Sequence, residues 1–181
     1  MEIIATAIKG LHEIRLKVIG DARGRFKRHF CERAFAEAGL ETRFVQMNHA
    51  VTLGRGTIRG MHYQLAPAEE VKLVSCTYGR VFDVAVDLRP GSPTYRCWAA
   101  LELDESVAYY IPKGCAHGFQ ALSEEAHLVY LHSAFYAPGA EAGVRHDDPA
   151  IRIAWPLPPA NLSARDQNFP LLALDPGNQA R

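Results

Sequence analysis

The segment 79–95, GRVFDVAVDLRPGSPTY, limits the possible folds of this chain more than any other. Its apolar residues occupy every second position, which is the period of a β-strand. They are Phe82, Val84, Val86 and Leu88. Two carboxylates, Asp83 and Asp87, share the opposite face. Because an unpaired buried carboxylate is costly, that face must either meet solvent or line a polar cavity, as the interior of a small barrel can.

The rest of the chain divides into further short segments separated by turn residues. The apolar patterns predict one strand at 43–51, two within 70–88, two within 106–122 and one at 127–136. One helix is expected at 29–40, where Gly39 is a typical C-terminal stop. Short strands with little helix predict an all-β fold, an antiparallel sandwich or barrel.

The 181 residues suit a single domain spanning 1–181. Regular periodicity fades after Ala137, so we expect 156–181 to be a C-terminal tail that packs over the barrel. Lys plus Arg and Asp plus Glu both number 20, which indicates neither a nucleic acid nor an anionic membrane as a partner. No stretch is typical of a signal peptide or a membrane span, so a cytoplasmic protein is expected.

The strand-like stretch GTIRGMHYQ, residues 56–64, places Arg59 and His62 where a buried strand would carry apolar residues. Strict alternation puts these two side chains on opposite faces. A glycine inside a strand often marks a bulge, and Gly60 would then turn both toward one cavity. On the pattern alone, an exposed arginine and a hydrogen-bonded packing histidine are the favoured interpretation.

A metal site is disfavoured by the spacing of the histidines. Metal-binding barrels commonly carry two histidines two positions apart, but the position two after His62 is Gln64, and the chain has no such pair. His62, His117 and a carboxylate can still converge in space, so a mononuclear site stays open. Lys72, in an apolar strand, is either exposed at an edge or buried with a partner such as Asp83.

A series of motifs follows in order from Asp21 to Asp166. They are DARGRF (21–26), FVQMN (44–48), IRGMHYQ (58–64), VKLV (71–74), GRVFDVAVDLRPGSPTY (79–95), IPKGCAHGF (111–119), YAPGAE (136–141), DDP (147–149), WP (155–156) and LSARD (162–166). Together they strongly resemble the dTDP-4-dehydrorhamnose 3,5-epimerase family of nucleotide-sugar epimerases. The resemblance implies a cupin-type jelly roll that acts as a homodimer without a metal or other cofactor.

The resemblance also implies a reaction at C3, C5 or both of a nucleoside-diphosphate 4-keto-6-deoxyhexose. His62 would be the general base, and Asp166 would hold its imidazole in the required tautomer. Lys72 would stabilise the enolate oxygen at C4. Tyr136 would return a proton from the opposite face, and His117 would lie near the sugar.

Further residues would bind the substrate by the same resemblance. Arg59 would bind the diphosphate, and Arg23 would reach the same group from the partner subunit, because guanidinium groups suit phosphate oxygens. Phe26 would stack near the base. The remaining predicted contacts are Arg28, Gln46, Asn48 and Glu141.

Arg28 departs from the family pattern, which has an acid at this position beside the nucleobase. An arginine cannot accept the hydrogen bond of thymine N3–H, whereas cytosine offers acceptors, so a CDP-linked or other sugar nucleotide stays open. Epimerisation at a single carbon also stays open. Two alternatives from other classes are a metal-dependent cupin dioxygenase and a non-catalytic sugar-nucleotide-binding protein.

Overall fold

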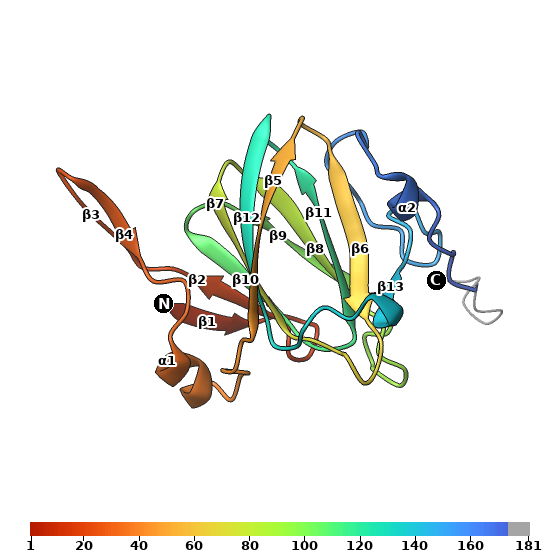
Figure 1. Cartoon of the computed structure of the whole chain (residues 1–181), viewed down its shortest axis with the longest axis horizontal. Helices are drawn as coiled ribbons and strands as arrows, with labels where there is room; N and C mark the ends of the chain where they lie inside the picture. Colours follow the sequence, from red (N-terminus) through yellow and green to blue (C-terminus); the bar gives the residue numbers. More distant parts are fainter. Residues whose placement is uncertain (174–181) are drawn as a thin grey trace.

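The structure, a computed structural model, describes residues 1–173 (Figure 1). The strands are β1 Glu2–Ala5, β2 His12–Arg15, β3 Val18–Asp21, β4 Gly24–Lys27, β5 Gln46–Leu53, β6 Ile58–Gln64, β7 Lys72–Tyr78, β8 Val81–Asp87, β9 Trp98–Leu103, β10 Val107–Ile111, β11 Cys115–Ala121, β12 Glu125–His132 and β13 Glu141–Gly143. The helices of the described part are α1 Glu32–Glu37, the 3-10 helix η1 Pro138–Ala140 and α2 Ala164–Gln167.

The strands form two sheets that face each other, and a separate hairpin. The six-stranded sheet has the order β1-β2-β10-β7-β12-β5, the five-stranded sheet the order β13-β6-β11-β8-β9, and β3 pairs with β4 alone. Strands joined by short turns lie in different sheets, as β7 and β8 do, and as β10 and β11 do. Such antiparallel strands that switch sheets are typical of a jelly roll. The predicted all-β fold is therefore confirmed.

Apolar side chains between the sheets form the main core. Val74 and Leu128 come from the six-stranded sheet, and Val81 and Phe119 from the five-stranded one. Burying a large apolar side chain contributes about 1.5–3 kcal/mol relative to leaving it exposed. Tyr130 packs against this core and also lines the polar cavity described below, so the core and the cavity share one interior.

Strand β8 is buried on both faces. Val84 and Val86 pack on its outer side against Ile151 and Trp155, which follow the last strand of the chain. Both faces of β8 are thus withdrawn from water, which explains why its acids cannot be solvent-facing. Residues 174–181 of the predicted tail lie outside the described residues.

The two acids of β8 are both fully buried, and each is paired in a different way. Asp87 accepts hydrogen bonds from Arg89 (Nη2, 2.8 Å), Ser92 (2.6 Å) and Thr94 (2.7 Å). These bonds outweigh burial and hold the Asp87 pKa below its usual value. Asp83 pairs with a histidine that lines the cavity. The face of β8 that carries the acids was expected to meet solvent or to line a polar cavity. Asp83 faces the cavity side through its histidine partner, whereas Asp87 stabilises a turn.

Two predicted elements are shorter than expected. The helix expected at 29–40 begins only at Glu32, because Cys31 is extended, and it ends before Gly39, whose φ of 69° favours glycine. The strand expected at 127–136 ends at His132, because its partners β5 and β7 begin opposite that residue. The following segment, with Tyr136, leaves the sheet.

The hairpin of β3 and β4 was not predicted and stands away from the body (Figure 1). Ile19 and Phe26 on it are exposed. Within residues 1–173, no helix is long and apolar enough to cross a membrane.

Candidate active site

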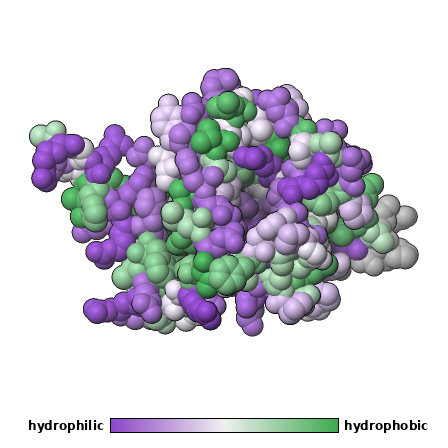
Figure 2. Space-filling view, in the orientation of Figure 1, coloured by the Kyte–Doolittle hydropathy of each residue, from purple (hydrophilic) through white to green (hydrophobic). Residues whose placement is uncertain are grey.

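A cavity of ≈ 310 Å³ lies between the two sheets. Strands β5, β7 and β12 of one sheet and β6 and β11 of the other contribute to its walls. In the space-filling view, hydrophilic residues gather around the hollow in the middle of this face of the molecule (Figure 2). The predicted site residues that line the cavity are Asn48, Arg59, His62, Lys72, His117, Tyr136 and Glu141.

A break in the β6–β11 ladder brings Arg59 and His62 to the same cavity. His117 lies opposite His62, but the register shifts before Phe119 meets Arg59. Gly60 lies at this break with a φ of 136°, and a Cβ there would approach Gly118 Cα to 2.5 Å. Only glycine fits so close a backbone contact. The predicted bulge at Gly60 is confirmed. Arg59 is exposed and His62 is hydrogen-bonded, as the pattern alone predicted, but both side chains also line the cavity.

His62 and Asp166 form a hydrogen-bonded pair. His62 Nε2 lies 2.8 Å from Asp166 Oδ1, and Asp166 Oδ2 accepts the Gly60 N–H (3.1 Å). Burial raises the Asp166 pKa, but the bonds from His62 and Gly60 outweigh it and lower that pKa to about 2. The ionised carboxylate can only accept, so the neutral imidazole carries its proton on Nε2 and keeps Nδ1 as the basic nitrogen.

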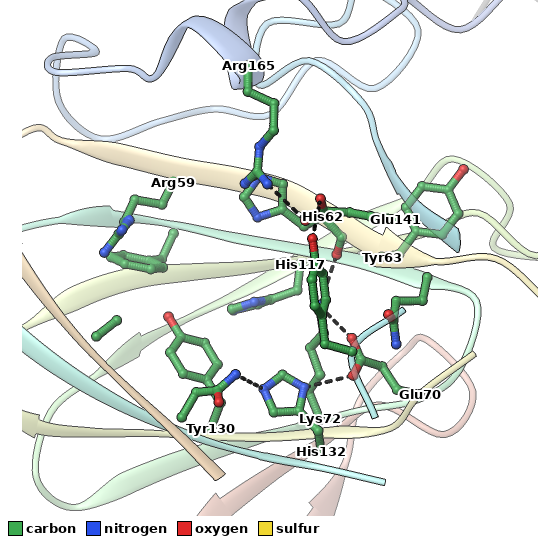
Figure 3. Close-up of a pocket in the computed structure, with 15 residues that line it drawn as sticks. Arg59, His62, Tyr63, Glu70, Lys72, His117, Tyr130, His132, Glu141 and Arg165 are labelled. Atoms are coloured by element: carbon green, nitrogen blue, oxygen red, sulfur yellow. Dashed lines mark hydrogen bonds and ion pairs between the residues drawn. The ribbon is translucent and has the colours of Figure 1, made fainter. Parts of the chain in front are cut away.

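Arg165 extends from α2 toward His62, as Figure 3 shows. Its Nη1 donates to Glu141 Oε1 (2.9 Å). Its Nη2 lies 3.0 Å from His62 Nε2, but both are donors in the tautomer that Asp166 sets, so this approach is not a hydrogen bond. Its Nε donates to Asp166 Oδ1 (3.3 Å). The guanidinium thus ties the histidine–aspartate pair to the wall of the cavity that carries Glu141.

A second pair, His117 and Asp83, lies deeper. His117 Nε2 is 2.9 Å from both carboxylate oxygens of Asp83, and the two side chains are 5% and 0% exposed. Burial raises the pKa of Asp83, and the partner histidine only partly opposes this. The His117 ring meets Tyr130 edge-on, with 5.9 Å between ring centroids.

Lys72 is buried beside Glu70, which corrects the expected pairing with Asp83. Its Nζ lies 3.4 Å from Glu70 Oε1 and donates to the His62 carbonyl (3.2 Å). The hydrogen bonds of Asp83 go to His117 instead. Burial lowers the Lys72 pKa, against the opposing charge of Glu70. The lysine is therefore buried, and its ion-pair partner is Glu70, a neighbour that the sequence did not suggest.

Two tyrosines line the cavity in different settings. Tyr136 is 53% exposed at the rim, where its hydroxyl donates to Glu141 Oε2 (3.2 Å) and its backbone N–H donates to Gln46 Oε1 (3.1 Å). Tyr130 is partly buried on β12, and its ring stacks on His132 with centroids 6.0 Å apart. Burial raises the Tyr130 pKa.

Comparison with known proteins agrees with this geometry. The family model described as dTDP-4-dehydrorhamnose 3,5-epimerase matches residues 5–173. The chain belongs to this family.

Individual relatives cover nearly the whole chain. It is 43% identical over 171 residues to a dTDP-4-dehydrorhamnose 3,5-epimerase of Shigella flexneri, covering 93% of this chain and 94% of the relative. It is 44% identical over 176 residues to a dTDP-4-dehydrorhamnose 3-epimerase of Streptomyces niveus, covering 96% and 84%. A Legionella pneumophila epimerase solved with dTDP-4-keto-L-rhamnose superposes with a TM-score of 0.86 at 41% identity, covering 91% and 89%.

Family membership confirms the resemblance drawn from the motifs and makes the chain an isomerase of the cupin-type jelly-roll class. Three predicted nucleotide contacts, Arg23, Phe26 and Arg28, are nevertheless not brought to this chain's own cavity. Arg23 and Phe26 lie on the projecting hairpin, and Arg28 follows it directly. Arg23 pairs there with Asp21 (2.5 Å), and its side chain is 89% exposed.

Sequence reasoning missed Tyr130, His132, Glu70 and Arg165. The alternation of β12 held a signal for two of them, because Tyr130 and His132 share the inward face with Leu128. No comparable signal existed for Glu70 or Arg165, which neighbour the predicted residues Lys72 and Asp166. Within residues 1–173, no cluster of three or more His, Cys, Asp or Glu side chains is arranged to hold a metal ion.

Proposed function

We propose that this chain epimerises a dTDP-linked 4-keto-6-deoxyhexose at C3, C5 or both, in deoxysugar biosynthesis. One observation carries the proposal: a histidine base held by an ionised aspartate, His62 and Asp166 at 2.8 Å, lines a cavity that also contains the buried cation Lys72. The names of the relatives, which include a 3,5-epimerase and a 3-epimerase, support the same chemistry.

The arrangement suits proton abstraction beside a ketone. His62 takes the proton from the carbon next to C4, and the electron pair moves onto the C4 oxygen. The Lys72 ammonium stabilises the resulting enolate, because a fixed charge in a partly dry site interacts strongly with developing negative charge. No cofactor takes part in this mechanism.

The returning proton must come from the other face of the sugar. Tyr136 was predicted as this acid, but its hydroxyl is at the rim and already donates to Glu141. We propose Tyr130 instead, because it lies on the six-stranded sheet, opposite His62 on the five-stranded sheet. Its raised pKa keeps the phenol protonated and able to donate. Tyr136, whose backbone N–H donates to Gln46, would contact the nucleotide.

A homodimer is the second part of the proposal. The outer face of β5 exposes Met47, Val51 and Leu53, at 68%, 46% and 65%. Together with the exposed apolar residues of the hairpin, this surface is typical of an association site. Pairing of two copies there would bring the hairpin, with Arg23, to the partner's cavity. Light scattering after size exclusion should give a dimer, and Met47→Glu should shift it toward the monomer.

We further propose that the protein is cytoplasmic. The four cysteines, all within the described residues, are free thiols, which suits a reducing cytoplasm.

Arg28 is exposed beside the hairpin and would meet the base only in the dimer. Comparing turnover of dTDP- and CDP-linked substrates tests the base, and a preference for CDP would overturn the dTDP assignment.

The decisive experiment is incubation with dTDP-4-keto-6-deoxyglucose in D2O. Deuterium should appear at C3, C5 or both, and His62→Ala should abolish the exchange. Tyr130→Phe should retain exchange but lose inversion, because abstraction does not need the opposite acid, and Tyr136→Phe should mainly weaken substrate binding. Absence of exchange in the wild-type protein with any nucleotide-linked 4-keto sugar would contradict the proposed activity.

A further inference from the structure

A chain of hydrogen bonds runs from the rim of the cavity to its floor. The Tyr136 backbone N–H donates to Gln46 Oε1 (3.1 Å), and Gln46 Nε2 donates to Asn48 Oδ1 (3.3 Å). Asn48 Nδ2 then meets His132 Nε2 (3.3 Å), and His132 Nδ1 meets Glu70 Oε2 (2.8 Å). Figure 3 shows the inner end of this hydrogen-bond chain, where His132 lies beside Glu70 and Lys72.

The two ends of the chain determine its direction. A backbone N–H, that of Tyr136, can only donate, and an ionised carboxylate, that of Glu70, can only accept. The three groups between them can each donate or accept. All of them must therefore point the same way, which requires a proton on His132 Nδ1 and a free lone pair on His132 Nε2. The orientation of the Gln46 and Asn48 amides therefore follows from the two ends of the hydrogen-bond chain. It does not depend on which atom of each amide is assigned as nitrogen.

The ionised state of Glu70 is secured by its surroundings. Burial raises its pKa, but the bond from His132 and the charge of Lys72 outweigh burial and lower that pKa. The side chains of Glu70 and His132 are only 7% and 11% exposed. Glu70 Oε1 faces Lys72 and Oε2 faces His132, so one carboxylate serves both the buried cation and the chain.

The direction of the chain decides what Gln46 and Asn48 offer a ligand. Each amide nitrogen has two hydrogens and uses one of them inside the chain. One N–H from each amide is left to donate. A ligand rich in acceptors, such as the hydroxyl, carbonyl and phosphate oxygens of a sugar nucleotide, is thereby favoured. A reversed chain would lose the Tyr136 bond and change this donor pattern.

We propose that Glu70 and His132 are positioning residues that set the amide orientation of Gln46 and Asn48 for binding of the sugar nucleotide. The inference rests on the proposed function for the identity of the ligand. Neither residue needs to touch the reacting carbons. Their contribution should therefore appear in substrate affinity more than in the rate of the chemical step.

Paired variants at His132 test the role in binding. His132→Phe keeps a ring but removes both hydrogen bonds, whereas His132→Gln can still donate to Glu70 and accept from Asn48. We expect His132→Phe to raise KM about tenfold, as for the loss of one good hydrogen bond, with kcat reduced less than threefold. His132→Gln should restore KM to within about threefold of the wild-type value.

A matched control is His12→Phe, which removes a histidine whose Nδ1 lies 3.0 Å from the Gly10 carbonyl, on β2 and outside the cavity walls. It should leave both constants unchanged. Equal losses in His132→Phe and His132→Gln, or a fall in kcat at constant KM, would overturn the positioning role.

The tautomer of His132 provides a test that needs no substrate. Ring ¹⁵N chemical shifts of the wild-type protein should show the Nδ1–H form. In Glu70→Gln the amide oxygen should face Lys72, so its N–H₂ would donate to His132 Nδ1 and convert the ring to the Nε2–H form. An Nε2–H ring in the wild-type protein, or no change in Glu70→Gln, would refute the proposal. The two proposals can fail separately. If the wild-type enzyme shows no exchange in D2O but His132 has the expected tautomers, the proposed function is wrong and the hydrogen-bond chain is still supported.

Discussion

Two histidine–carboxylate pairs in this molecule have similar distances but different surroundings. His62 and Asp166 lie 2.8 Å apart with side chains 24% and 4% exposed. His117 and Asp83 lie 2.9 Å apart with side chains 5% and 0% exposed. The pKa of Asp166 is lowered, to about 2, and that of Asp83 is raised. The two pairs have similar geometry but differ in accessibility, so the more exposed His62 is the better candidate for proton exchange with a substrate, whereas His117 reaches the cavity from a buried pair.

The origin of the pairs differs too. His117 and Asp83 lie on adjacent strands, β11 and β8, and are held rigidly by one sheet. His62 receives its partner from α2, a short helix that begins after Ser163. The Ser163 side chain accepts the Asp166 N–H (3.1 Å), which fixes the start of that helix. The accessible pair thus depends on the segment after the last strand for its geometry.

The largest expected effect comes from Asp166→Asn. The amide can present N–H to His62 Nε2 and so favour the wrong tautomer, which should lower kcat by about 10²–10⁴. Steady-state kinetics measure the change. Asp104→Asn is the control, because Asp104 Oδ1 accepts from the nearby Ser106 hydroxyl (2.6 Å), outside the cavity walls, and should leave kcat unchanged.

Asp83→Asn should act mainly on stability. It weakens a buried hydrogen-bonded pair, so the free energy of unfolding should fall by about 1–3 kcal/mol in urea titrations. The loss of kcat should stay below about tenfold. A loss of kcat as large as that of Asp166→Asn would show that the two pairs are functionally equivalent and would break the comparison.

The smallest effect is a difference in acid sensitivity. The lowered pKa of Asp166 stabilises the fold above the unfolded-state pKa, and this contribution is lost as the pH falls toward about 2. The raised pKa of Asp83 has the opposite effect on stability. The folded state binds a proton at Asp83 more readily than the unfolded chain does, so this group favours folding as the pH falls. Urea midpoints measured from pH 7 to pH 3 should therefore fall less steeply in Asp166→Asn and more steeply in Asp83→Asn than in the wild type. Parallel curves would contradict the assigned directions.

Local patterns predicted the elements better than their partners. The strands on both sides of Gly79 were expected because alternation and the turn glycine are encoded within a few residues. The hairpin of β3 and β4 was missed because its short strands are exposed and carry no buried face. The contact between Glu70 and His132 was missed because it joins residues 62 positions apart.

The sequence by itself determined the strand periods, the glycine at position 60 and the family, and it predicted several of the residues that line the cavity. Only the tertiary structure decided which carboxylate meets which histidine. Period two assigns a residue to a face of a strand but does not identify the neighbouring strand. The His62–Asp166 contact spans 104 positions and the His117–Asp83 contact 34, so each pairing exists only once the sheets and the segment after them have packed.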